Sequence, residues 1–294
     1  MEKEMLEKYK KAGEIAARAL QYAKGLVKEG ALIVEIVDRT EEKIGELGGQ
    51  PAFPMNISIN DIAAHYSPTA DDRTAIKKED YVKLDVGVHV DGYIGDNAIT
   101  VRLAGEDKLI ECSRKMLEKA LSMFVPGTTI AEVGAAVEET ARGLGFNPVT
   151  NLTGHSLARY NLHAGHVIPN VKNNNSKFFE EGEVYAVEPF ATSGAGAVKD
   201  SEPALIFRWI ADKPSRMPEA RKILELGKTS FSKLPFAKRW INLPRMKKEM
   251  ALRQLTATGA IYPYKILKEV SGGAVSQAEH TVMVGEKPLI TTKI

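Results

Sequence analysis

Residues 80–101 carry the sequence DYVKLDVGVHVDGYIGDNAITV, in which two apolar runs flank an Asp-Gly pair. Its centre, Asp91-Gly92, predicts a two-residue hairpin, because a type I′ turn needs positive φ at both central residues. Pairing Val90 with Tyr93 then sets the register. One face carries the mostly apolar pairs Val82–Val101, Leu84–Ile99, Val86–Asn97, Val88–Gly95 and Val90–Tyr93. The other face carries Lys83–Thr100, Asp85–Ala98, Gly87–Asp96 and His89–Ile94.

This register makes Asp85 and Asp96 diagonal neighbours on one face, roughly 7–8 Å apart. Gly87 lies opposite Asp96 and is expected to leave the space between the two carboxylates empty. Such a gap could hold one or two divalent cations, which lie about 3.5–4 Å apart in two-metal sites. An amphipathic hairpin with both aspartates in water is the alternative, and these residues alone do not decide between the two.

Composition bounds the class of protein. The chain has 294 residues, 44% of them hydrophobic, enough for one large domain or two. A net charge of +2 does not by itself indicate a nucleic-acid or membrane partner. The single cysteine, Cys112, excludes an intramolecular disulfide or a cysteine zinc site and fits a buried helix position. The Lys/Glu-rich start resembles no signal peptide, and no apolar run is long enough to span a membrane, so we expect a soluble, cytoplasmic protein.

The pattern of elements contains a weak internal repeat. Apolar periodicity predicts helices over 3–29, 33–47, 106–124 and 130–144, with Gly30 as a stop signal after the first. A strand is predicted over 51–59, followed by a loop that holds His65. The second helix pair and the residues after it echo the first. The matching segments are 47–51 with 144–148, His65 with His163, and 78–85 with 181–188. A duplicated unit about a pseudo-two-fold axis would bring both sets to one central site.

The segment 208–258 differs in charge from the rest of the chain. It holds 13 basic and 4 acidic residues, a net charge of +9, which leaves −7 elsewhere. Its apolar spacing predicts a small helical insertion, so we expect residues 1–207 and 259–294 to form one domain around it. The strand pattern resumes over 274–284, where Gln277 and Glu279 face the same side.

Five residues within or beside apolar strands suit a metal site: Asp85, Asp96, His155, Glu188 and Glu279. An oxygen-rich set with one imidazole favours two divalent cations such as Mn, Fe, Co or Zn over a structural zinc. Two cations would neutralise carboxylates that could not otherwise stay ionised together in one buried site. Any one of these residues alone could equally have a structural role. The five together, on repeat-related elements, support a metal site.

The chain resembles the methionine aminopeptidases of type II in their short archaeal form over nearly its whole length. The matching motifs are Pro51-Ala52-Phe53-Pro54, Ala63-Ala64-His65-Tyr66, Leu84-Asp85-Val86-Gly87-Val88, Gly154-His155, Leu162-His163-Ala164-Gly165, Val187-Glu188-Pro189-Phe190, Leu234-Pro235-Phe236-Ala237 and Gln277 with Glu279-His280-Thr281. The resemblance implies an α+β pita-bread fold: a pseudo-two-fold central antiparallel sheet, flanking helices and a helical insertion. It also implies removal of the initiator methionine from nascent proteins when the second residue is small.

The resemblance assigns a role to each candidate. Asp85 would hold one metal, His155 and Glu188 the other, and Asp96 and Glu279 would bridge both. A metal-bound hydroxide would attack the scissile carbonyl, since coordination lowers the pKa of water. The implied roles of the other residues are a proton carrier (Glu188), a hydrogen-bond donor to the oxyanion or scissile amide (His163), a substrate-positioning residue (His65) and methionine-pocket walls (Phe53, Leu162 and Tyr264).

Two departures from the family pattern stand near the site. Ala278 replaces an aromatic residue common in relatives and is expected to widen the pocket wall, and Asn97 replaces a threonine. A proline-specific aminopeptidase or dipeptidase of the same fold is one alternative function, favoured less by the motif around His163. A non-catalytic ribosome- or RNA-binding relative is another, disfavoured because all five ligands are present.

The basic insertion leaves its partner open. Clustered Lys and Arg could dock against ribosomal phosphates, whereas a solvated helical face bordering the cleft explains the charge equally well. We expect a monomer.

Overall fold

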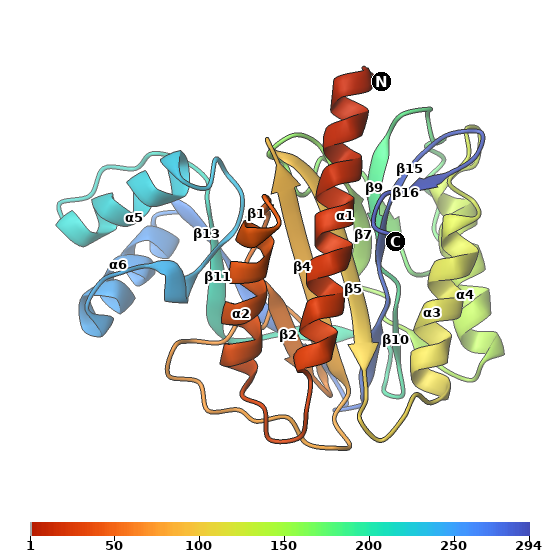
Figure 1. Cartoon of the computed structure of the whole chain (residues 1–294), viewed down its shortest axis with the longest axis horizontal. Coiled ribbons are helices and arrows are strands. Elements are labelled where there is room, and N and C mark those ends of the chain that lie inside the picture. The colour runs from red at the N-terminus through yellow and green to blue at the C-terminus, as the bar shows by residue number, and fades with distance from the viewer. Residues whose placement is uncertain (1) are drawn as a thin grey trace.

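Two helix pairs flank the strands of the computed structural model, which describes residues 2–294 (Figure 1). The first pair is α1 (Lys3–Leu26) and α2 (Ile33–Glu46), and the second is α3 (Lys108–Leu121) and α4 (Ile130–Gly143). The first-half strands are β1 (Gln50–Pro51), β2 (Asn56–Ile59), β3 (Ile62–Ala64), β4 (Val82–Val90) and β5 (Tyr93–Val101). The second-half strands are β6 (Asn147–Pro148), β7 (Thr153–Ser156), β8 (Val167–Pro169), β9 (Val184–Val187), β10 (Phe190–Thr192) and β11 (Val198–Trp209). The last part of the chain adds β13 (Ile261–Glu269), β14 (Val275–Gln277), β15 (His280–Met283) and β16 (Leu289–Ile290).

The predicted hairpin is confirmed in every pair of its register. β4 and β5 pair antiparallel from Val82–Val101 to Val90–Tyr93. Asp91 and Gly92 have φ of 52° and 85°, the positive values that a type I′ turn requires. The apolar face of β4 packs under α1 and α2 in one hydrophobic cluster. The opposite face is also buried, and Asp96 is only 2% exposed, so the solvated amphipathic alternative is excluded.

The helix predictions hold with small corrections at the ends. The second and fourth helices end close to the predicted positions, and Thr129 caps α4 through a capping box with Glu132. The first helix ends at Leu26, short of the predicted residue 29. Gly30 therefore lies beyond the helix in a turn, where it has φ of 81° and its N–H donates to the Ile76 carbonyl.

The strands predicted over 51–59 and 274–284 are each interrupted in the structure, so the prediction of two continuous strands was wrong. Residues 52–55 leave the sheet between β1 and β2, consistent with Pro54, which has no N–H to donate to a ladder. The predicted strand over 274–284 is likewise interrupted between β14 and β15. At that break Glu279 forms an isolated antiparallel bridge with Ala98 of β5. This bridge joins β5, from the first half of the chain, to the C-terminal strands and brings Glu279 close to Asp96.

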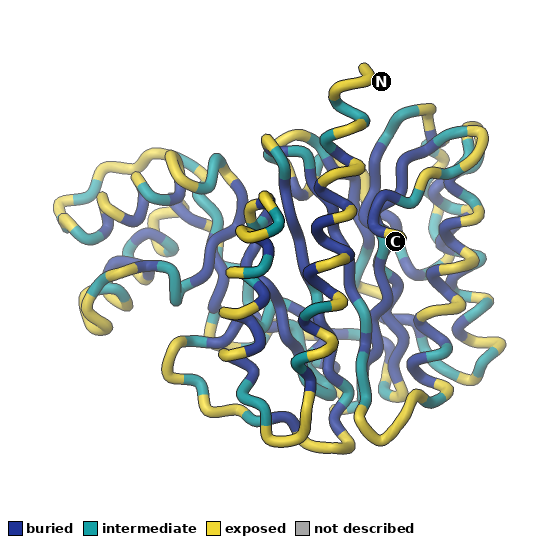
Figure 2. Tube along the Cα trace, in the orientation of Figure 1, coloured by how far each residue is buried: buried dark blue, intermediate teal, exposed yellow. Residues whose placement is uncertain are grey.

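Three hydrophobic clusters account for most of the buried interior shown in Figure 2. One lies under α1 and α2, and its counterpart lies under α3 and α4, where Cys112 is buried as expected. The third is formed by residues 204–261 around α5 (Pro218–Thr229) and α6 (Arg245–Ala257). Short β12 (Phe236–Ala237) and a 3₁₀ turn, Lys238–Trp240, lead from α5 toward α6, and β12 pairs with β11. No helix among residues 2–294 is long and apolar enough to cross a membrane.

Candidate functional site

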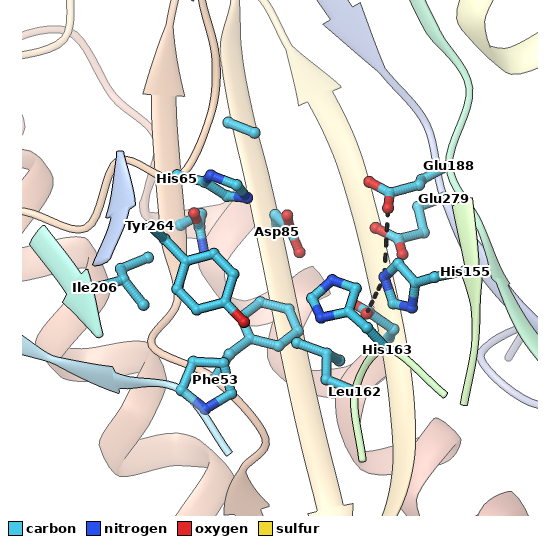
Figure 3. A pocket seen from close by; sticks show the side chains of 14 residues that line it. Phe53, His65, Asp85, His155, Leu162, His163, Glu188, Ile206, Tyr264 and Glu279 are labelled. Carbon is cyan, nitrogen blue, oxygen red and sulfur yellow. Dashed lines mark ion pairs between the residues drawn. The ribbon is translucent and has the colours of Figure 1, made fainter. Parts of the chain in front are cut away.

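One cavity at the junction of the two halves brings together every site residue predicted from the sequence (Figure 3). These are Phe53, His65, Asp85, Asp96, His155, Leu162, His163, Glu188, Tyr264 and Glu279. They come from elements distributed from residue 53 to residue 279, so only the folded chain assembles them. Glu188, Glu279 and His155 lie on one side of the cavity in Figure 3, Ile206 and Tyr264 lie on the other, and Asp85 lies between them.

Three carboxylates form a compact oxygen cluster. One ligand atom each from Asp85, Asp96 and Glu279 lies within 4.8 Å of the others. Asp85 and Asp96 come from the facing strands of the hairpin, and Glu279 reaches them because its backbone is bridged to Ala98 on β5. Three carboxylate oxygens at this separation could hold a divalent cation.

A second group of ligand atoms adjoins this cluster. The Nε2 atom of His155 lies 3.4 Å from a Glu188 oxygen and 3.9 Å from an Asp96 oxygen. Burial lowers the pKa of His155 well below its usual value, as does the neighbouring His163. A neutral imidazole keeps a lone pair for a metal, so His155 and Glu188 can serve as ligands beside Asp96.

The carboxylates are electrostatically costly without a cation. Burial raises the pKa of Asp85 to about 7. Burial, together with the neighbouring carboxylates, also raises the pKa of Asp96, Glu188 and Glu279 well above the usual value. The Oδ1 atoms of Asp85 and Asp96 are buried with no hydrogen-bond partner among residues 2–294. Inward-facing, unpaired oxygens of this kind fit a divalent metal, which would satisfy them and neutralise their charge.

Two polar neighbours orient the cluster. The Nε2 atom of Gln277 lies 3.3 Å from a Glu188 oxygen and 3.4 Å from a Glu279 oxygen, as its predicted orientation beside Glu279 implies. The Thr281 hydroxyl accepts from the Asp96 N–H at 2.7 Å and donates to the Asp96 carbonyl at 2.9 Å. These two hydrogen bonds fix the Asp96 backbone and so hold its side chain beside Asp85 and Glu279.

The structure corrects the role expected of Gly87. A Cβ atom built on Gly87 would lie 2.1 Å from Cε1 and 2.4 Å from Cδ1 of Phe53. The aromatic ring therefore occupies the space over Gly87 that the sequence suggested was left open for metals. Gly87 allows the pocket wall, rather than the metal site, to approach β4.

The rings of His65, His163 and Tyr264 also line the cavity. Tyr264 lies between the two repeat-related histidines, with ring centroids 5.4 Å from His65 and 6.2 Å from His163. Burial lowers the pKa of His163 to about 4, with smaller contributions from His65 and Arg208. Burial also lowers the pKa of His65, whose Nδ1 lies 3.1 Å from the Lys265 carbonyl. A carbonyl only accepts, so His65 carries its proton on Nδ1 and presents a lone pair at Nε2.

The cavity also contains residues to which the sequence interpretation gave no role. They are Asn56, Ala64, Ile206 and Pro235. Ile206 comes from β11, where only the strand pairing reveals that it lies opposite Tyr264. The expectation for Ala278 was wrong: it packs against the α3–α4 cluster and does not line this cavity. Its replacement of an aromatic residue therefore leaves the pocket wall intact.

Comparisons with known proteins agree with this geometry. The chain matches metallopeptidase family M24 over residues 7–221. It is 50% identical over 287 residues to a methionine aminopeptidase of Thermococcus kodakarensis, covering 96% of this chain and 97% of that relative. Its fold is similar to that of a thermophilic Arx1, with a TM-score of 0.88, 19% identity, and coverage of 99% of this chain and 91% of that one. It is also similar to a methionine aminopeptidase of Thermotoga maritima, with a TM-score of 0.74, 23% identity and coverage of 100% and 98%. The expected pita-bread fold is confirmed.

Proposed function

The chain belongs to metallopeptidase family M24, and we propose that it removes the N-terminal methionine from peptides and nascent proteins by metal-dependent hydrolysis. The observation that supports this most strongly is one cavity that joins a carboxylate–histidine cluster to an apolar and aromatic wall. The cluster suits divalent cations, and the wall suits an unbranched apolar side chain beside them.

We propose that two divalent ions, of the Co, Mn, Fe or Zn type, are held by five residues. Asp85 would bind one ion, His155 and Glu188 the other, and Asp96 and Glu279 both. The 4.8 Å oxygen cluster and the two contacts of His155 support this assignment. Bound metals supply a water nucleophile that is active near neutral pH and polarise the scissile carbonyl.

The chain's own residues complete the chemistry. His163 is neutral at physiological pH because its pKa is lowered to about 4, so it can donate one N–H to the oxygen or amide at the scissile bond without adding positive charge. Glu188 lines the same cavity as His163, and the family resemblance assigns it to carry a proton to the leaving amine. The acceptor at Nε2 of His65 would position a backbone N–H of the substrate.

Methionine selectivity is assigned to the apolar wall. Phe53 and Leu162 are 7% and 8% exposed, and Ile206, Pro235 and Tyr264 enclose the same space. A cavity of aromatic and aliphatic walls favours a flexible thioether side chain. A proline-specific peptidase is the alternative, and it would use the same ligands with a different pocket, so substrate comparison separates the two.

We also propose that residues 208–258 form a helical insertion subdomain, supported by the separate hydrophobic cluster around α5 and α6. Their net charge of +9 is compatible with docking against ribosomal phosphates. Location in the cytoplasm and a monomeric state stay predictions. If charge reversal at Lys247 and Lys248 leaves co-sedimentation with ribosomes unchanged at low salt, the docking proposal is wrong.

Turnover of Met-Xaa peptides by the metal-loaded enzyme tests the main proposal. We expect Met-Ala and Met-Gly peptides to be hydrolysed, bulky second residues to be refused, and Xaa-Pro peptides without methionine to be left intact. Cleavage of Xaa-Pro substrates in preference to Met-Ala would favour the proline-specific alternative.

A further inference from the structure

A basic groove adjoins the candidate active-site cavity on its insertion side. It is lined by Arg159, Tyr160, Asn161, Arg208, Trp209, Lys228, Ser232 and Lys233. These residues include four cations, and no Asp or Glu belongs to the lining within the described chain. The groove residues come from three segments: the loop after β7, the end of β11, and the last turn of α5 with the loop that follows it.

The same three segments also line the active-site cavity. Asn161 of the groove is followed by Leu162 of the cavity, and Lys233 of the groove precedes Pro235 of the cavity by two positions. On β11, Ile206 pairs with Tyr264 and Arg208 pairs with Tyr262, without a bulge between them. Because strand side chains alternate, Arg208 faces the same side as Ile206, one step further from the metal ligands. The groove thus continues the cavity outward.

Two of the four cations have no anionic partner among the described residues. Arg159 pairs with Asp91 at 2.7 Å, and Lys228 pairs with Asp212 at 2.6 Å. Arg208 and Lys233 form no ion pair with any residue between 2 and 294. The Nε atom of Arg208 is also buried without a hydrogen-bond partner among those residues. A buried, unpaired guanidinium nitrogen is costly, and a carboxylate is the partner whose geometry matches the guanidinium fork.

On this basis, and resting on the proposed function, we infer that the groove binds the part of the substrate that follows the scissile bond and selects a carboxylate there. The first two substrate residues occupy the cavity, so the third to fifth residues extend into the groove, each adding about 3.3–3.6 Å of extended chain. A carboxylate on one of them pairs with Arg208 and Lys233. The enzyme therefore favours N-termini that are acidic just beyond the second residue.

Two hexapeptide amides test the inference: Met-Ala-Ser-Glu-Gly-Ser-amide and its Gln counterpart at the fourth position. The terminal amide removes the free carboxylate, and a free-acid Met-Ala-Ser arm shows whether a C-terminal carboxylate is recognised in the same way. At low ionic strength we expect kcat/KM to be about 3–10-fold higher for the Glu peptide, the range of one or two partly exposed ion pairs. This ratio should approach one at high salt, because added ions screen such pairs.

Variants locate the effect. Arg208→Gln and Lys233→Gln should each lower the Glu/Gln ratio about 2–3-fold, and the double variant should bring it close to one. Lys222→Gln is the matched control, since Lys222 is an exposed lysine of α5 that does not line the groove, and it should keep the ratio. Anisotropy of the labelled products Ala-Ser-Glu-Gly-Ser-amide and Ala-Ser-Gln-Gly-Ser-amide provides the same comparison without catalysis.

The outcomes separate this inference from the proposed function. If the Gln peptide is hydrolysed but the wild-type ratio is one at low salt, only the groove inference is overturned. If neither peptide is hydrolysed, the proposed function fails, and the product-binding ratio still decides whether the groove selects a carboxylate. The double variant could instead keep the Glu/Gln ratio of kcat/KM and lose binding of a single-stranded RNA. That result would show that the groove binds phosphates and would overturn the inference.

Discussion

Replacing Gly87 with alanine tests the structural correction made to the site. The added Cβ would lie 2.1 Å from Cε1, 2.4 Å from Cδ1 and 2.7 Å from Cζ of Phe53. Carbon atoms pack at about 3.5–4.0 Å, so the ring has to move by more than about 1 Å. Such overpacking costs about 1–3 kcal/mol of stability. The displaced ring narrows the pocket proposed for methionine, and we expect KM for Met-Ala peptides to rise about tenfold while the metal content stays at the wild-type value.

Calorimetric unfolding, steady-state kinetics and metal analysis measure these three quantities on one preparation. Gly25→Ala is the matched control, because Gly25 lies in α1 with no atom within 4 Å of the added Cβ. It should leave KM unchanged and stabilise the helix slightly. Combining Gly87→Ala with Phe53→Leu should recover part of the lost stability, since the two side chains compete for one space. Loss of metal from Gly87→Ala with KM unchanged would show instead that Gly87 clears space for the ions.

Three further predictions concern changes at His163, at Asp85 and at Glu41, which contacts the insertion. His163→Ala should lower kcat by roughly 10²–10³-fold while metal content stays at the wild-type value, as expected for a lost transition-state donor; a loss of metal would make His163 a ligand instead. In metal-free protein, the pKa of Asp85 is raised from 3.8 to about 7, so the folded state holds a proton that the unfolded state has released. We therefore expect the free energy of unfolding of the metal-free wild type to fall by up to about 4 kcal/mol, relative to that of Asp85→Asn, as pH rises from 4 to 7. Denaturant unfolding of both metal-free proteins across this pH range measures the difference. Glu41→Ala removes the buried partner of Arg239 and should destabilise the protein by about 3–5 kcal/mol, and a change below 1 kcal/mol in chemical denaturation would show that this contact does not anchor the insertion.

The hairpin and the repeat could be predicted because their signals are local. Asp91-Gly92 sets the turn and Val90–Tyr93 sets the register, so every cross-strand pair follows from two adjacent residues. The repeat related His65 to His163, and the structure places both beside Tyr264. The polar ligands also stood out, because a carboxylate within an apolar strand needs a partner.

Features that depend on contacts between distant segments could not be predicted in this way. The Phe53 ring lies over Gly87 because residues 52–55 leave the sheet between β1 and β2. This contact depends on where that break falls, which the local sequence pattern does not show. The pairing of Ile206 with Tyr264 depends on β11 and β13 meeting across the whole insertion. Arg208 was counted only as one charge among 13, although its position at the mouth of the cavity distinguishes it from the others.

Asp96→Asn tests the central claim, that four carboxylates and one histidine hold two catalytic metal ions. Asp96 is 2% exposed and lies between the Asp85–Glu279 cluster and His155. A neutral amide has nearly the same shape but cannot serve as an anion shared by two cations. The decisive measurement is turnover of a Met-Ala peptide by the folded variant at saturating Mn or Co, with bound metal counted on the same sample. We predict two ions per chain and rapid turnover in the wild type, with fewer ions and no detectable turnover in the variant. Near-wild-type turnover of the metal-saturated variant would contradict the two-metal assignment.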